Sequence, residues 1–286
     1  MTQSAALTGL VLTFNEEKNI AACVESLLPL AKSIFIVDSG STDRTVAIAD
    51  QLGARVVHHP FETHARQWRW GLDNLPIESE WVLALDADQR LSSQLQQEIS
   101  AFIEKNPRAN GAYLRRRQMF RGAPIRFGGY GSKRLLKLFR RAAVHIDVDE
   151  YVDHHFAVAG PTVVLKHFMI EENRNEDDIG VWISKHNRYA MLQAREEIDR
   201  VPPRGKLFGS ADDRVRWLKR MWSRQPLYVR PFLYFFYRYF IRLGILDGRQ
   251  GLVFHFMQAL WYRLLVDVNI AQLRGQQAGD REPLST

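Results

Sequence analysis

Short apolar runs alternate with segments of helical periodicity over the first ninety residues, and this order restricts the possible folds more than any other feature of the chain. The apolar runs predict four strands, at residues 7–14, 34–37, 55–58 and 81–85. Runs this short and this apolar are typical of strands that are buried on both faces of a parallel sheet. Because parallel neighbours need a crossover connection, usually a helix, the order predicts an α/β fold with a Rossmann-like, mostly parallel sheet flanked by helices.

Polar side chains collect where three of these strands should end. They are Thr13, Asn15 and Glu17 after the first run, Asp38 after the second, and Asp86 and Asp88 after the fourth. Ligands of open α/β sheets bind beyond the carboxyl ends of the strands, in pockets built from loops. The pattern therefore predicts a nucleotide pocket at this edge of the sheet.

The Asp-x-Asp pair formed by Asp86 and Asp88 has two interpretations. Carboxylates at this spacing can hold a hard divalent cation that neutralises a diphosphate, or they can simply cap the following turn. The chain has no Gly-x-Gly-x-x-Gly after the first strand and no Gly-Lys-Ser/Thr loop, which argues against a dinucleotide site and a P-loop. Arg90 stands where a phosphohydrolase of the Asp-x-Asp-x-Thr/Val type would have Thr or Val.

The composition is that of a globular protein, with 46% hydrophobic and 25% charged residues in a chain of 286. Cys23 is the single cysteine, which excludes an internal disulfide and fits a reducing compartment. The first residues lack the basic and apolar regions of a signal peptide, and no apolar window of eighteen residues is free of charge. We therefore expect neither export nor a transmembrane helix.

The middle of the chain predicts a helix at residues 91–103 and strands at 111–120, 135–139 and 163–167, the last ending in a histidine. Between the first two of these strands, residues 121–133 are rich in glycine and basic side chains. This segment has two interpretations, a mobile loop near the substrates or a solvated hairpin connection.

Three ordered motifs resemble the family 2 inverting glycosyltransferases, which have a GT-A fold. They are residues 12–20, 36–45 and 85–88. Residues 182–190 and 246–248 further resemble the bacterial branch that builds lipopolysaccharide core or other envelope glycans. The resemblance implies a GT-A catalytic domain at residues 1–200, with a nucleotide-sugar half at about 1–105 and an acceptor half at about 106–200.

The resemblance also implies a donor site. Thr13, Asn15 and Glu17 would line the nucleotide pocket, with Glu17 near the ribose. Asp38 would accept a hydrogen bond from the base, usually uracil, and Arg66 would be a further donor contact.

A divalent metal, Mg²⁺ or Mn²⁺, is implied beside the diphosphate. Asp88 would contact this metal, and Asp86 would contact the ribose or a metal-bound water. His167 would be a third metal ligand or a phosphate contact, with a packed structural histidine as the alternative. The metal would stabilise the leaving nucleoside diphosphate as a Lewis acid.

An inverting transfer needs a carboxylate that removes the proton of the acceptor hydroxyl as it attacks. The acidic and histidine-rich segment 147–155 supplies the candidates: Asp153 first, with Asp149 and Glu150 behind it. Related sequences often have Val-Asp-Glu-His here, so His154 stands at a family Glu position. If that Glu is the base, this chain lacks it, and the alternative hypothesis is a non-catalytic, membrane-associated scaffold that retains the GT-A fold.

The basic excess belongs to the C-terminal region, because residues 201–286 carry a net charge of +8 and residues 1–200 a net charge of −1. Aromatic side chains accompany it, and Phe232, Phe236 and Tyr239 share one predicted helical face. Basic and aromatic residues together predict a helical region that lies in a membrane interface. The alternative is a helical cap packed on the catalytic domain or on another copy of the chain. No recognition motif accompanies the charge, so we expect no nucleic-acid partner.

The sequence thus predicts a metal-dependent inverting glycosyltransferase of bacterial envelope glycan synthesis. Its donor would be a nucleotide-sugar, UDP-linked as is usual in the family, and its acceptor a membrane-associated glycolipid or polysaccharide. We expect a cytoplasmic protein that is peripheral on the inner face of the cytoplasmic membrane.

Overall fold

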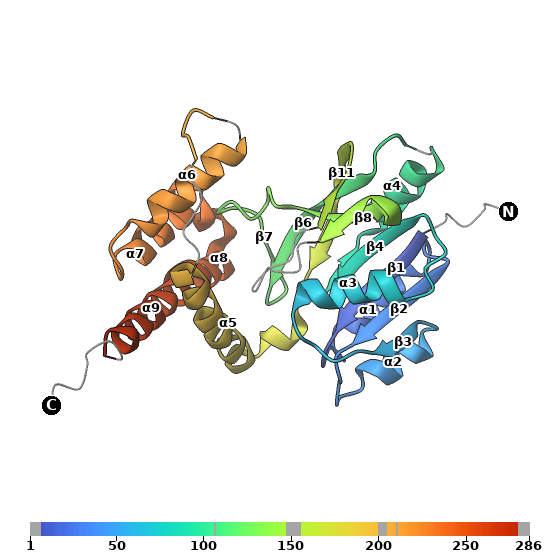
Figure 1. Cartoon of the computed structure of the whole chain (residues 1–286), viewed down its shortest axis with the longest axis horizontal. Helices are drawn as coiled ribbons and strands as arrows, with labels where there is room; N and C mark the ends of the chain where they lie inside the picture. Colours follow the sequence, from blue (N-terminus) through green and yellow to red (C-terminus); the bar gives the residue numbers. More distant parts are fainter. Residues whose placement is uncertain (1–6, 106, 147–155, 200–204, 210, 280–286) are drawn as a thin grey trace. The chain divides into compact units, whose positions relative to one another are not determined.

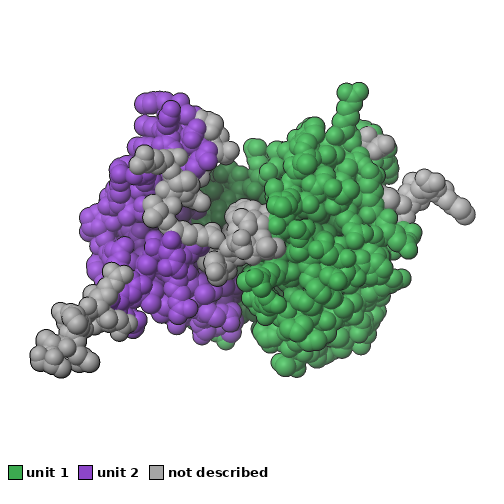
Figure 2. All heavy atoms as spheres, viewed as in Figure 1, with its two compact units in different colours: residues 1–179 green, residues 180–286 purple. Residues whose placement is uncertain are grey.

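The computed structural model describes residues 7–105, 107–146, 156–199, 205–209 and 211–279. The chain divides into two compact units, unit 1 at residues 1–179 and unit 2 at residues 180–286 (Figure 1; Figure 2). This division lies at the first residue of α5 (Ile179–Asp199), whereas the predicted boundary at residue 200 lies just beyond the last residue of that helix.

Unit 1 contains a mixed sheet whose described strands follow the order β3-β2-β1-β4-β8-β6-β11-β5. Its first half is parallel and confirms the four predicted strands. They are β1 (Leu7–Thr13), β2 (Ser33–Asp38), β3 (Arg55–His58) and β4 (Trp81–Asp86).

The second half of the sheet contains both parallel and antiparallel strand pairs. Here β8 (Arg134–Arg140) is antiparallel to both β4 and β6 (Gly111–Phe120). Next, β11 (Thr162–Glu171) is parallel to β6 and antiparallel to β5 (Gln89–Leu91). The predicted mostly parallel order therefore describes the first half, and β11 runs on past His167, where the sequence had predicted its end. Short strands complete the unit: β7 (Ala123–Ile125) pairs with β6, and β9 (Val144–Ile146) pairs with β10 (Phe156–Val158).

Helices cover both faces of the sheet, because alternate residues of its central strands are apolar on both sides (Figure 1). One face packs against α1 (Ile20–Leu27), α2 (Thr45–Gln51) and α4 (Ser93–Glu104). The other face packs against α3 (His64–Asn74), where a Cβ atom at Gly71 would lie 3.3 Å from Val37 Cγ2. Glycine therefore allows α3 to approach the strands closely.

Unit 2 is helical in its described residues. After α5 come α6 (Ala211–Ser223), α7 (Arg230–Phe236), α8 (Gly248–His255) and α9 (Tyr262–Gly279), with π-helical turns at Tyr237–Ile241 and Phe256–Trp261. A small apolar core joins α5 to α9 through Ala190, Ala194 and Val266. The buried Arg230 donates from Nε to Asp267 Oδ1 at 2.7 Å and pairs through Nη2 with Glu197 Oε2 at 2.9 Å. Among the helices that the structure describes, we find none with the length and hydropathy needed to span a bilayer.

Candidate active site

The parallel register brings the ends of β1, β2 and β4 to one edge of the sheet. Thr13 lies opposite Asp38 in the β1–β2 ladder, and Leu12 lies opposite Asp86 in the β1–β4 ladder. Thr13 Oγ1 is buried, and it has no hydrogen-bond partner among the described residues. Because an unpaired buried hydroxyl is costly, Thr13 is a group that a bound ligand can satisfy.

Asp38 orders the loop that follows β2. Its Oδ2 accepts hydrogen bonds from the backbone nitrogens of Gly40 and Ser41, each at 2.9 Å, and its Oδ1 accepts one from Ser41 Oγ at 2.5 Å. Gly40 adopts a φ of +94°, a conformation that side-chain-bearing residues avoid. A carboxylate has about four acceptor positions, so Asp38 retains capacity for one more donor, and its contact with a base stays a prediction.

Asn15 joins the loop after β1 to the loop after β2. Its φ of +54° lies in the left-handed region, which Asn tolerates better than most residues. Its backbone nitrogen donates to Ser41 Oγ at 2.8 Å, and its Oδ1 accepts from the Thr42 nitrogen at 2.8 Å. The two loops are therefore fixed to each other before any ligand binds.

Glu17 makes a second bridge between the same loops. Its Oε2 accepts from the Arg44 nitrogen at 3.2 Å, and its backbone nitrogen donates to Asp43 Oδ2 at 3.1 Å. Burial opposes ionisation of Asp43, but hydrogen bonds from Thr45 Oγ1, Thr45 N and Glu17 N outweigh it and lower the pKa of Asp43. The geometry thus gives Asn15 and Glu17 a structural role in addition to the predicted donor contacts.

Lys137, which the sequence prediction missed, lies beside Asp86. This residue of β8 is only 4% exposed, and its Nζ lies 2.9 Å from Asp86 Oδ2. The ammonium group also lies 5.5 Å from the ring centroid of Trp68 and 5.9 Å from that of Phe156. A lysine within the otherwise apolar core of a strand was the available signal. Asp86 thus has a buried cation as an ion-pair partner.

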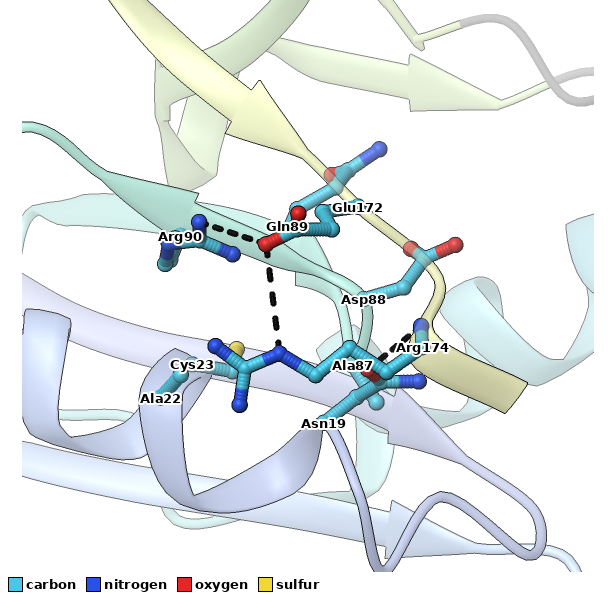
Figure 3. A pocket seen from close by; sticks show the side chains of 9 residues that line it. All are labelled: Asn19, Ala22, Cys23, Ala87, Asp88, Gln89, Arg90, Glu172 and Arg174. Carbon is cyan, nitrogen blue, oxygen red and sulfur yellow. Dashed lines mark hydrogen bonds and ion pairs between the residues drawn. The ribbon is translucent and has the colours of Figure 1, made fainter. Parts of the chain in front are cut away.

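Asp88 lies in the turn between β4 and β5, beside a shallow hollow (Figure 3). The hollow is lined by Asn19, Ala22, Cys23, Ala87, Asp88, Gln89, Arg90, Glu172 and Arg174. Within it, Glu172 Oε2 lies 2.7 Å from Arg90 Nη2 and 3.9 Å from Arg174 Nε, and the Asp88 carboxylate points away from these ion pairs (Figure 3). The hollow is shallow and has no enclosed volume, so it does not by itself form a complete donor site.

Cys23 lies behind the two aspartates. Its Sγ is 3.7 Å from the Asp86 carbonyl oxygen, to which the thiol donates. Burial, followed by the negative charges of Asp88 and Asp86, raises the pKa of the Cys23 thiol far above its ordinary value. The thiol is therefore protonated and contributes no nucleophile.

The segment after β11 forms hydrogen bonds to the loop after β1, and no sequence motif predicted this contact. Asn19 Nδ2 donates to Asn173 Oδ1 at 3.1 Å, and Asn19 Oδ1 accepts from the Arg174 nitrogen at 3.0 Å. Asn175 Nδ2 donates to the Asn15 carbonyl oxygen at 3.1 Å. Polar residues from distant parts of unit 1 thus meet at the predicted nucleotide edge.

Arg66 lies on the first turn of α3 and is exposed. Its Nη1 lies 2.5 Å from Glu62 Oε2, and within the described residues no hydrogen bond or ion pair joins it to the strand-end residues named above. The adjacent and buried Gln67 instead reaches the loop after β2, because its Nε2 donates to Ser39 Oγ at 3.1 Å. Gln67 is a positioning residue that the sequence prediction missed.

His167 lies at an irregular part of β11, where its Nδ1 is 2.8 Å from Glu98 Oε2. Burial opposes ionisation of Glu98, but hydrogen bonds from Lys166 N, His167 N and the His167 ring lower its pKa. Glu172, whose nitrogen donates to the Asp88 carbonyl, comes five residues after His167, or about 16 Å along the extended chain. The structure does not bring His167 to Asp88, and the described residues contain no group of three His, Cys, Asp or Glu side chains arranged for a metal.

The predicted base and its neighbours, Asp153, Asp149 and Glu150, lie outside the described residues. His154, which stands at the family Glu position, also lies outside them.

Comparison with known proteins shows the family to which the chain is similar. The family model described as Glycosyl transferase family 2 matches residues 10–152. An uncharacterized glycosyltransferase of Rickettsia felis is 39% identical over 93 residues, a match that spans about a third of each chain (32% of both). Lipopolysaccharide core biosynthesis glycosyltransferase LpsC of Rhizobium meliloti is 25% identical over 279 residues, covering 91% of this chain and 92% of LpsC.

Solved structures show weaker similarity. The crystal structure of Staphylococcus aureus TarS 1–349 is 15% identical with a TM-score of 0.44, over 96% of this chain and 92% of that one. A Mycobacterium tuberculosis glucosyl-3-phosphoglycerate synthase in complex with phosphoglyceric acid is 16% identical with a TM-score of 0.43, over 66% and 77%.

Proposed function

Because the chain belongs to glycosyl transferase family 2, we propose that it transfers a sugar from a nucleotide-sugar, UDP-linked, to a membrane-associated glycolipid or polysaccharide with inversion. The observation that carries this proposal is the shared edge of β1, β2 and β4. There Thr13, whose hydroxyl has no partner among the described residues, lies in register with Asp38, and Asp86 ends β4 on the other side of β1. The long match to LpsC supports an acceptor in lipopolysaccharide core or a related envelope glycan.

Asp86 and Asp88 fit a divalent metal. Mg²⁺ is commonly held by one or two carboxylates together with substrate phosphates, so a cluster of three protein ligands is not required. Asp88 would hold the cation, while Lys137 holds Asp86 at 2.9 Å. A bound Mg²⁺ or Mn²⁺ would supply Lewis-acid stabilisation of the leaving diphosphate.

The chain's own groups have separate tasks in this proposal. Thr13 and Asp38 bind the nucleoside, and the bridges through Asn15 and Glu17 keep both loops in place for it. The proton of the acceptor hydroxyl would pass to a carboxylate of segment 147–155, with Asp153 as the first candidate.

The test is nucleoside diphosphate release from a panel of nucleotide-sugars with Mg²⁺ or Mn²⁺ and membrane glycolipid extract. We expect Asp88→Ala to lower the rate by about 100-fold or more, because stabilisation of the leaving group by several kcal/mol is lost. Asp50→Ala is the matched control, since Asp50 is an exposed carboxylate on α2. Circular dichroism of both variants checks that the fold persists.

Undiminished release by Asp88→Ala would refute the assigned role of this carboxylate. The scaffold hypothesis makes a different prediction, namely that the wild-type protein binds a nucleotide and releases none from any donor. Nucleotide binding is measured in the same samples by thermal shift, because a ligand of the native state raises its stability.

We also propose that unit 2 lies on the cytoplasmic membrane surface. Large apolar side chains that are each 44–61% exposed lie in or near its first π-helical turn, Tyr237–Ile241, in the sequence: Phe232, Phe236, Phe240, Ile241 and Leu246. The rings of Phe236 and Phe240 lie 5.1 Å apart, so these two exposed side chains are the centre of the proposed patch. The exposed Arg242 and Arg249 accompany the patch in sequence, and cations beside aromatic residues favour anionic headgroups.

A further inference from the structure

Three arginines are brought together on one face of the second half of the sheet. Arg115 and Arg117 are two residues apart on β6 and therefore point to the same face. Arg134 of β8 lies directly opposite Arg115 in the antiparallel register. We call Arg115, Arg117 and Arg134 the arginine cluster.

An aromatic ring supports two members of the cluster. Phe168 of β11 lies opposite Arg115 on the other side of β6. The guanidinium carbon of Arg115 is 4.5 Å from the centroid of the Phe168 ring, and that of Arg117 is 4.1 Å away. Contact with a ring orders a guanidinium while leaving N–H groups at its edge available to an acceptor, and Arg115 uses one of them, since its Nη1 donates to the Lys166 carbonyl oxygen at 3.3 Å.

The described part of the chain supplies no carboxylate partner for these charges. Among the residues that the structure describes, none of the three arginines forms a salt bridge with an Asp or Glu. Arg116, on the opposite face of the same strand, has such a partner, since its Nη1 lies 2.8 Å from Glu171 Oε1. Like charges directly opposite in a sheet destabilise it, so an external anion would relieve the repulsion between Arg115 and Arg134.

The cluster lies close to the proposed donor site. Arg117 is opposite Ile170 of β11, and Ile170 is opposite Arg90 of β5. Two strand spacings, about 10 Å, therefore separate Arg117 from Arg90, which is the second residue after Asp88.

We propose that the arginine cluster binds a phosphate group carried by the acceptor, on a sugar or on a lipid headgroup. Paired guanidinium forks match the oxygens of a phosphate, and no carboxylate among the described residues pairs with them. This inference rests on the proposed function, because it names the acceptor chemistry of that reaction.

The test measures phosphate binding without donor or metal. Full-length protein is titrated with glucose 6-phosphate at constant ionic strength, with glucose as the neutral probe. We expect Arg117→Gln/Arg134→Gln to raise the dissociation constant by about tenfold or more, because charge-assisted hydrogen bonds are lost. The matched control is Lys105→Gln/Arg108→Gln, which removes the same charge from exposed residues before β6.

A second arm uses phosphatidylcholine vesicles with and without phosphatidic acid. Arginine-dependent binding of glucose 6-phosphate alone assigns the phosphate to a sugar, and arginine-dependent binding to phosphatidic acid vesicles assigns it to a headgroup. The proposal is overturned if the double variant binds both probes like wild type, or if wild type does not prefer glucose 6-phosphate to glucose and does not prefer phosphatidic acid vesicles. Asp88→Ala should retain phosphate binding, so failure of the transferase proposal is distinguishable from failure of this one.

Discussion

The surroundings of His255 in unit 2 keep its imidazole ring neutral. Its side chain is fully buried in α8, and its Nε2 lies 3.9 Å from Asp247 Oδ2. Burial, reinforced by the positive charge of Arg238 and opposed by Asp247, lowers the pKa of His255 to about 4. A Cβ atom at Gly244 would lie within 2.4 Å of the ring, so the neutral histidine fills its site closely.

This shift predicts a pH-dependent stability. The pKa is about 4 in the folded state against 6.5 for an ordinary histidine, so protons favour the unfolded state between these values. The free energy of unfolding should therefore fall as the pH falls from 6.5 toward 4, by up to about 1.4 kcal/mol per pH unit from this group. Urea unfolding across this range measures the slope. His255→Gln should flatten it, and the exposed His145→Gln should leave it unchanged; equal slopes in all three proteins would contradict the assignment.

Single residues also show which parts of the candidate site could be predicted from the sequence and which could not. The convergence of Thr13, Asp38 and Asp86 was predictable, because parallel strands align their carboxyl ends. Lys137 was not, because it meets Asp86 only through the antiparallel pairing of β8 with β4. A hydrophobic pattern identifies such a strand but does not say beside which strand it lies.

At the level of elements, the first residue of α4 is determined by the pairing of β5 with β11 rather than by helical periodicity. Periodicity predicted a helix from residue 91, but Leu91 belongs to β5 and pairs with Met169 of β11. The helix begins instead after Ser92, whose Oγ accepts from the Leu95 nitrogen at 3.2 Å. Likewise β5, β7, β9 and β10 are three-residue strands stabilised by partners elsewhere in the chain, and such strands leave little local signal.

The cap of α4 makes a testable contribution. We expect Ser92→Ala to lower the free energy of unfolding by about 1 kcal/mol, because the Leu95 N–H loses its acceptor. Ser100→Ala, within the same helix, should be neutral or slightly stabilising, because alanine is the better helix former. Chemical denaturation of both variants gives the comparison, and equal losses would mean that Ser92 is not an effective cap.

At the scale of the whole molecule, each unit has its own apolar core and its own surface character. Unit 1 buries apolar side chains on both faces of its sheet, whereas unit 2 leaves a patch around Phe236 exposed. The sequence predicted aromatic residues on a helical face there, but the π-helical turn at Tyr237–Ile241 shifts the register of side chains beyond α7.

The membrane proposal predicts that Phe236→Ser weakens binding to vesicles of phosphatidylcholine and phosphatidylglycerol by about tenfold, because an inserted phenyl ring is lost. Phe61→Ser is the control, since Phe61 is 50% exposed in unit 1 and Phe236 is 54% exposed. Co-sedimentation measures the binding. If wild-type protein does not bind vesicles but forms a dimer that Phe236→Ser weakens, a second copy of the chain would be favoured as the partner that covers the patch.

The burial of Cys23 has a practical consequence. The chain contains one cysteine, and its protonated thiol lies behind Asp86 at the junction of α1 and β4. An alkylating reagent reacts with thiolate, so native molecules are labelled only when this junction opens. Labelling of Cys23 therefore reports the opening of unit 1, with one label per chain. Nucleotides that bind at the strand ends should lower the logarithm of the labelling rate in proportion to the free energy of stabilisation they add.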